Sequence, residues 1–224
     1  METLYQTLRI VHIGAGMTAF FVAPVALLAH KGGKVHAFWG NVFFWGMVAV
    51  AASAAALTFL NPNAFLFLVA VFSFHMSLSG YRAVVRRRAA DPARAAKTDL
   101  VIAAAMILFY LALAGWGVHL FMLRPHHPFG YVSLAFAGLG LRFSVTQIYG
   151  FLRPSGNRTA WWYDHMQGMV GSYIAAVSAF SAVNFVFLPD MLRWLWPTMI
   201  GAPLLWYWKR HYQRKFRGQV ARPA

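Results

Sequence analysis

The sequence predicts an all-α protein that spans a membrane with a bundle of about seven helices. Of the 224 residues, 60% are hydrophobic and only 11% are charged, whereas a soluble domain carries roughly 25% charged residues. The apolar residues form long runs, most of them near the ~20 residues that cross a bilayer as a helix. Lys and Arg gather in the short segments between these runs, which is typical of multi-pass membrane proteins.

The apolar runs follow one another with short connections. The first connection contains the basic turn AHKGGKVHAFWG, where Gly32 and Gly33 let the backbone reverse. The third run has a polar middle, with His75 among serines, so we expect this helix to face protein. The basic connector 86–98 follows it and is interpreted as a surface loop. The predicted spans cover residues 7–29, 37–60, 64–85, 99–122, 129–151, 166–188 and 191–208.

The last four predicted spans complete the bundle. The fourth and fifth flank an Arg-Pro-His-His-Pro loop, and the sixth begins directly after Asp164 and His165. The seventh is short and rich in tryptophan, a residue that gathers at membrane interfaces. We therefore predict a transmembrane domain at 1–208 and a basic cytoplasmic tail at 209–224. Small residues at helical spacing permit close helix contact, as at Gly14, Gly138 and Gly168.

The distribution of basic residues predicts the orientation. With the N-terminus outside, 16 of the 20 Lys and Arg residues lie on the inner side and three, Arg9, Arg124 and Arg193, on the outer side, while Arg142 lies within a predicted span. This bias predicts an outer N-terminus and a cytoplasmic C-terminus. Because the net charge of +15 sits in these connecting segments, the expected partner is the lipid bilayer and not nucleic acid. The chain has no cysteine, which excludes disulfides and thiolate metal sites.

Histidines on several predicted spans are the first candidates for a cofactor or metal site. Ionisable groups at membrane depth are costly and usually functional. We expect His75 near the midplane, His12 and His119 as an outer pair, and His36 and His165 as an inner pair. Their imidazoles could bind haem iron or another transition metal. Each could instead be a packed polar residue that hydrogen-bonds to a neighbouring helix. The candidate ligands are His12, His36, His75, His119 and His165.

A second group of polar residues is expected nearer the inner face. These residues could relay protons or bind an anion, although an arginine can also extend to the interface and an aspartate can cap a helix. The predicted relay residues are Arg82, Arg142, Gln147 and Asp164. No catalytic residue is predicted, and the sequence leaves open whether the protein is an enzyme.

Three segments carry a resemblance to a known family. They are HKGGKVHAFWGNVFFWGM at His30–Met47, SGYRA at Ser79–Ala83 and DHMQGMVGSYIAAVSAFSAVN at Asp164–Asn184. At these segments, which include an HKGGxxH and an HxxxM motif, the chain resembles a family of uncharacterised bacterial multi-pass membrane proteins. The resemblance implies a multi-pass protein of the bacterial inner membrane. It directs attention to His12, His36, Arg82 and His165 and implies no activity.

Our preferred functional hypothesis is electron transfer with a quinone, carried by b-type haem or a transition metal on the buried histidines. The alternative is a proton-coupled transporter or channel that uses the His, Asp and Arg groups. Pro24 and Pro203 lie inside predicted spans and would free backbone carbonyls of the kind that transport sites use. A third hypothesis is a structural or assembly protein without a ligand.

Overall fold

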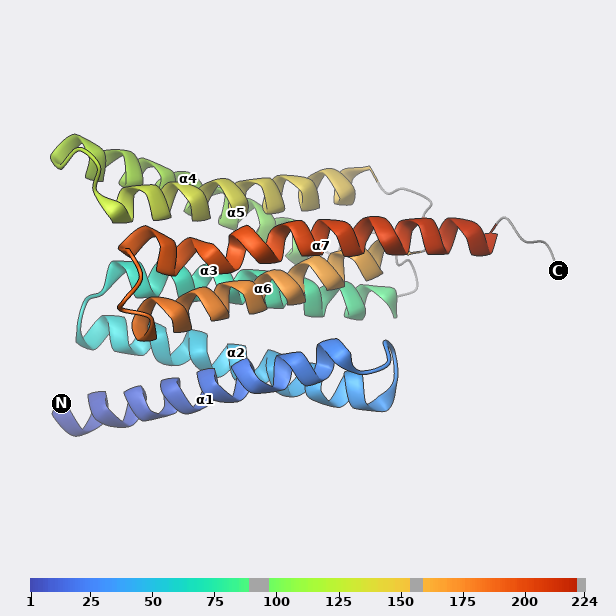
Figure 1. The fold of residues 1–224 in the computed structure, drawn as a ribbon, viewed down its shortest axis with the longest axis horizontal. Helices are drawn as coiled ribbons and strands as arrows, with labels where there is room; N and C mark the ends of the chain where they lie inside the picture. The colour runs from blue at the N-terminus through green and yellow to red at the C-terminus, as the bar shows by residue number, and fades with distance from the viewer. Residues whose placement is uncertain (89–96, 154–158, 221–224) are drawn as a thin grey trace.

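The computed structural model describes residues 1–88, 97–153 and 159–220, which form seven α-helices and no β-strand. The helices lie side by side with their axes roughly aligned (Figure 1). In chain order they are α1 (Glu2–Leu28), α2 (Lys34–Leu60), α3 (Ala64–Arg87), α4 (Lys97–Leu123), α5 (Pro128–Leu152), α6 (Ala160–Asn184) and α7 (Asp190–Val220). The prediction of an all-α bundle is therefore confirmed for the described residues.

Six of the helices, α1 to α6, are long and apolar enough to cross a membrane. This confirms a multi-pass, membrane-type bundle. The seventh helix, α7, is not among the six. It contains Pro197 and Pro203, and it runs on into a basic segment. A seventh crossing and the orientation of the termini remain predictions.

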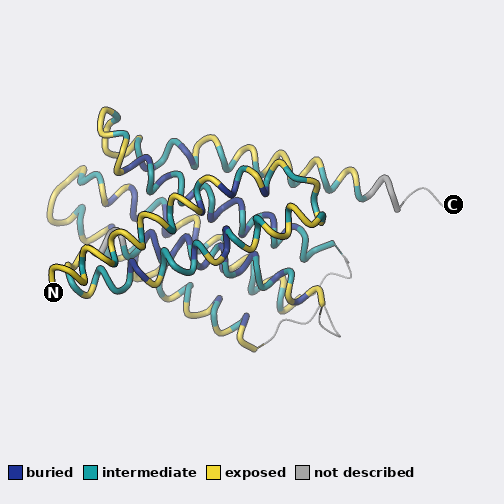
Figure 2. The backbone as a smooth tube through the Cα atoms, turned by 90° about the horizontal axis from the view of Figure 1, so that it is seen from below, coloured by how far each residue is buried: buried dark blue, intermediate teal, exposed yellow. Residues whose placement is uncertain are grey.

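The central helix pair is α3 and α6. The α1–α2 hairpin lies along one edge of the bundle and the α4–α5 hairpin along the opposite edge, with α3 and α6 between them (Figure 1). Helix α7 packs on α6, and α2 packs on α3. Buried positions gather on the inward sides of the helices, while the edge helix α1 is largely exposed (Figure 2). In a bilayer, the exposed apolar side chains of the outer faces meet lipid.

Two glycines bring α3 and α6 into backbone contact. A Cβ atom on Gly168 would lie 2.5 Å from the backbone nitrogen of Gly80, closer than any side chain tolerates. The predicted role of small residues in close helix contact is confirmed at Gly168. It is wrong for Gly14 and Gly138, because a Cβ atom on either would meet nothing within 4 Å.

The two largest differences from the predicted boundaries are at α6 and α7. Helix α6 begins at Ala160, six residues before the predicted span. Helix α7 continues to Val220 through most of the predicted tail and extends beyond the other helices (Figure 1). Aromatic packing explains both differences, because the ring of Trp162 lies 4.4 Å from that of Tyr212 and 5.5 Å from that of Phe216. These contacts continue the α6–α7 interface past the apolar segment.

Candidate functional site

One end of the bundle concentrates both the charges and most of the predicted relay. Helices α1, α3 and α5 end there, and α2, α4 and α6 begin there (Figure 1). We call it the basic end, because its described residues include Lys31, Lys34, Arg86, Arg87, Arg88, Arg153 and Lys209.

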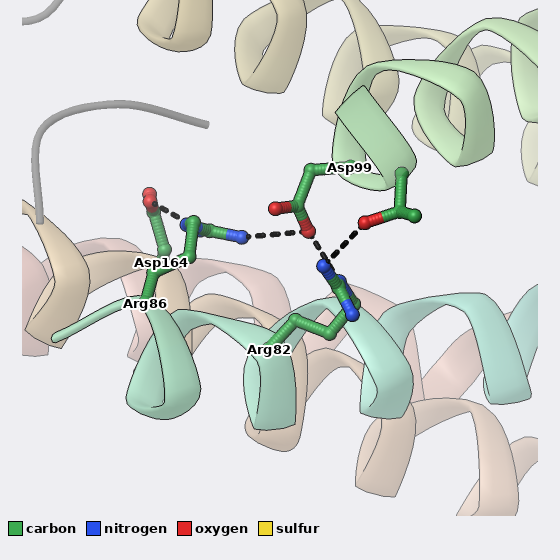
Figure 3. A network of polar contacts seen from close by, with 5 residues as sticks. Arg82, Arg86, Asp99 and Asp164 are labelled. Carbon is green, nitrogen blue, oxygen red and sulfur yellow. Dashed lines mark hydrogen bonds and ion pairs between the residues drawn. The ribbon is translucent and has the colours of Figure 1, made fainter. Parts of the chain in front are cut away.

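Two arginines and two aspartates form a linked cluster at the basic end, which we call the Arg–Asp cluster: Arg82, Arg86, Asp99 and Asp164 (Figure 3). One Arg86 nitrogen, Nη1, lies 3.2 Å from Asp99 Oδ1, and the other, Nη2, lies 3.4 Å from Asp164 Oδ2. Arg82 Nε also pairs with Asp99 Oδ1, and its Nη2 donates to the Thr98 hydroxyl at 2.7 Å. The cluster joins α3, α4 and α6.

The cluster runs from the interior to solvent. Arg86 is 8% exposed and Asp99 is 4% exposed, so both charges are buried against each other. The Asp164 side chain is 40% exposed and forms the outer end of the cluster. A buried charge that loses its partner costs about 3–5 kcal/mol, so the four residues hold one another in place.

Half of this cluster was predicted from the sequence. Arg82 and Asp164 were both expected in the relay, but Asp99 was missed. The interpretation of the connector 86–98 as a surface loop is wrong for Arg86, because α3 continues to Arg87 and turns Arg86 inward. One signal was present: Asp99 is one of only five acidic residues in the chain and directly precedes an apolar run.

The side chain of Gln147 on α5 connects the cluster to the middle of the bundle. A small void of about 10 Å³ lies between Gln147 and the cluster, and a space of this size holds about one water molecule. Its polar lining comes from α3, α4 and α5: Ser79, Arg82, Arg86, Asp99 and Gln147. Gln147 also lies close enough to His75 to interact with its imidazole.

The imidazole of His75 is 2% exposed and lies at the centre of α3, about 17 Å from the start of the helix. Its Nδ1 atom lies 2.9 Å from the hydroxyl oxygen of Tyr110 on α4. Its Nε2 atom is buried and has no hydrogen-bond partner among the described residues. The prediction of a midplane histidine on a protein-facing helix agrees with this geometry.

An apolar recess of about 280 Å³ opens beside His75. Helices α2, α3 and α4 line it, and His75 is its one ionisable lining residue. The other lining residues are Ala51, Ala55, Phe67, Ala70, Val71, Phe74, Leu78, Ile102 and Met106.

The predicted inner pair, His36 and His165, is brought together. Their ring centroids lie 6.1 Å apart at an interplanar angle of 79°. His36 Nδ1 lies 2.8 Å from the carbonyl oxygen of Ala26 on α1, and His165 Nδ1 lies 3.0 Å from that of Gly80 on α3. A carbonyl oxygen only accepts hydrogen bonds, so both Nδ1 atoms donate. In the neutral rings, the lone pair is therefore on Nε2, the atom that would bind a metal.

Lys31 adds a partly buried cation near this pair. Its ammonium group donates to the carbonyl oxygen of Leu27 at the end of α1, a group that has no partner within its own helix. Lys31 is close enough to His165 to interact with it electrostatically. Burial lowers the pKa of the Lys31 ammonium group from its usual value, because desolvation disfavours the charged form.

The predicted outer pair is not brought together. His12 lies on α1 and His119 on α4, at opposite edges of the bundle (Figure 1). His12 Nδ1 lies 3.0 Å from the hydroxyl oxygen of Ser53 on α2, whereas His119 is exposed. The sequence placed these histidines at one depth, but depth along parallel helices does not decide which helices are neighbours.

Arg142, which was predicted as a relay residue, lies outside the Arg–Asp cluster. It is exposed on α5, and no described carboxylate pairs with it. It lies near Lys209 of α7, which donates to the Gln167 side chain at 3.1 Å. In the described part of the chain, no group of three or more His, Asp or Glu side chains could hold a metal ion.

Comparisons with known proteins assign no family or function to this chain, so a functional proposal depends on the geometry described above. No family model, no curated protein and no solved structure matches the chain.

Proposed function

We propose that this chain is a proton-coupled membrane protein in which a polar relay links solvent at the basic end to His75 in the middle of the bundle. The observation that carries the proposal is the position of Gln147. Its side chain borders both His75 and the small void lined by the Arg–Asp cluster. Polar groups therefore follow one another from exposed Asp164 to buried His75.

The groups in this line have two different roles: some transfer protons, and others keep a fixed positive charge. Carboxylates, imidazoles and water bind and release protons, whereas an arginine stays protonated. We assign proton transfer to Asp164, Asp99, a water in the void and His75. Arg82 and Arg86 hold the two carboxylates in position through ion pairs.

Buried hydroxyl groups support a continuation beyond His75. The Oγ atoms of Ser172 and Ser178 on α6 are buried and have no hydrogen-bond partner among the described residues. Buried polar groups of this kind are the usual binding positions of internal water. Helix α6 packs directly on α3, the helix that carries His75.

Proton flux into liposomes tests the proposal. The purified protein is reconstituted with a pH-sensitive dye inside the vesicles, and a potassium diffusion potential drives protons inward. We expect a flux well above that of protein-free vesicles, reduced at least tenfold by Gln147→Leu and by His75→Phe. Gln147→Leu leaves an apolar side chain that is one heavy atom shorter and removes the hydrogen-bonding groups.

Two substitutions outside the line serve as matched controls. His119→Phe and Arg142→Gln change the same or similar residue types at exposed positions on α4 and α5, so the flux should be unchanged. If Gln147→Leu conducts like the unsubstituted protein, the relay is wrong.

A second candidate function is electron transfer through a metal or haem on His36 and His165. The favouring observation is that both Nδ1 atoms donate to backbone carbonyls, which leaves both Nε2 lone pairs available to iron or copper. His165 contacts α3 at Gly80, about 8 Å along the helix axis from His75. A visible spectrum of the purified protein with haem added, together with elemental analysis, decides this candidate. Without a Soret band or a stoichiometric metal, it fails.

A further inference from the structure

We propose that the recess beside His75 binds the ring of a quinone-type molecule, with the isoprenoid tail leaving along α3 into the bilayer. This inference rests on the proposed function, because it names the class of ligand that would meet the relay at His75. It also makes a separate claim about binding. Two features of the recess support it: its shape and its single polar anchor.

The recess has the shape and size of a site for a small ring with an apolar tail. Its volume of about 280 Å³ is near the lower limit of small-molecule sites, roughly 300 Å³. Along α3 it extends from Phe67 to Leu78, about 17 Å of helix. Residues of α2 and α4 form its two walls, and the proposed ligand enters between them from the bilayer.

The depth of the recess selects among lipid-soluble molecules. His75 lies at the centre of a membrane-spanning helix, about 15 Å from either edge of the hydrocarbon core. A phospholipid headgroup stays at the interface and does not reach this depth. A hydrocarbon chain reaches it but offers no partner to an imidazole. The quinone class combines an apolar tail with ring oxygens that hydrogen-bond at the midplane.

The surroundings of His75 suit both the oxidised quinone and the reduced quinol form of such a ring. A quinone carbonyl needs a hydrogen-bond donor, and a quinol hydroxyl also needs an acceptor. The Nδ1 atom of His75 faces the hydroxyl of Tyr110, which can donate or accept, so either tautomer of the imidazole is satisfied there. The Nε2 atom is buried and has no hydrogen-bond partner among the described residues, so a ring oxygen that reached it would give it one. His36 and His165 lack this freedom, because carbonyl oxygens fix their tautomers.

Photolabelling tests the site directly. The probe is an azido-benzoquinone with a short isoprenoid chain, added to the full-length protein in nanodiscs, and labelled peptides are identified by mass spectrometry. We expect labelling on residues 67–78 that an excess of unlabelled short-chain benzoquinone abolishes. His75→Phe should weaken the competing quinone about tenfold, since it removes one hydrogen bond.

Filling the recess provides the decisive variant. Ala55→Trp places a large side chain against the recess wall, and Ala51→Leu fills it partly if the larger residue impairs folding. Both should abolish or strongly reduce the competed labelling. Ala104→Trp makes the same change at an exposed position on α4 and should leave labelling intact.

The outcomes separate this inference from the relay. Ala55 lies outside the polar line, so loss of labelling with unchanged proton flux in Ala55→Trp supports both proposals. Competed labelling of residues 67–78 in a protein without proton flux supports the quinone site and overturns the relay. The quinone site is wrong if labelling is insensitive to Ala55→Trp, or if a saturated long-chain lipid competes as well as the quinone does.

Discussion

Arg86, in the last turn of α3, lies 3.2 Å from Asp99, in the first turn of α4. Both side chains are more than nine-tenths buried, and each has a further ionic partner, Asp164 for Arg86 and Arg82 for Asp99. The pair therefore joins two helices directly and a third through Asp164 (Figure 3). Its removal should affect stability as well as proton transfer.

Replacing Asp99 should destabilise the protein strongly. Asp99→Ala leaves Arg82 and Arg86 without their shared carboxylate, and we expect the free energy of unfolding to fall by about 3–5 kcal/mol. Thermal unfolding in detergent measures the change. Arg88→Ala is the control, because Arg88 is exposed at the end of α3 and should change stability by less than about 0.5 kcal/mol. Equal effects of the two substitutions would show that the cluster contributes little.

The contact between α3 and α6 should tolerate no methyl group at Gly168. Gly168→Ala places a Cβ atom against the backbone of Gly80, so the helices must separate, at a cost of about 1–3 kcal/mol. The hydrogen bond from His165 to the Gly80 carbonyl would lengthen with them. Gly138→Ala, where nothing lies within 4 Å, should be neutral or slightly stabilising. The stability difference between these two variants checks the prediction.

The hydrogen bond between His12 and Ser53 should contribute only modestly to stability. The Ser53 hydroxyl donates to the carbonyl oxygen of Ala49 at 2.6 Å, so its oxygen accepts from Nδ1 of His12. Side-chain hydrogen bonds between membrane helices average about 0.6 kcal/mol and reach about 1.7 kcal/mol. A double-mutant cycle with His12→Ala and Ser53→Ala should give a coupling energy in this range. A much larger value would assign His12 a further partner.

Single cysteines should establish the orientation and decide whether α7 crosses the membrane. The chain has no cysteine, so each introduced thiol reports alone. Asn61, Arg88 and Arg214 are exposed. With a membrane-impermeant thiol reagent on intact cells, we expect Asn61→Cys to react and Arg88→Cys to react only after permeabilisation.

The third position tests α7 by itself. Arg214→Cys should behave like Arg88→Cys if α7 crosses, and like Asn61→Cys if it does not. Labelling of Arg88→Cys in intact cells would reverse the predicted orientation.

The sequence predicted where many residues of the candidate site lie along the helix axis, but not which way their side chains point around it. An α-helix rises 1.5 Å per residue, so the position of His75 within its apolar run gave its depth, and Arg82 and Asp164 were correctly expected towards the same end. Rotation about the helix axis and the choice of neighbouring helix did not follow. For this reason Asp99 and Tyr110 were missed, and His12 and His119 were wrongly paired.

The sequence by itself determined the helices of the bundle and the positions of its polar residues along them, because hydrocarbon solvent requires each crossing segment to be a long apolar helix. Only the tertiary structure decided which side chains meet. The close approach of α3 and α6 at Gly80 and Gly168, the turn of Arg86 towards Asp99 and the recess between α2, α3 and α4 depend on packing between helices far apart in the chain. Hydropathy differs little around most of these helices, so it does not identify which helices are neighbours. The fit of small residues and the buried ion pairs identify the neighbours.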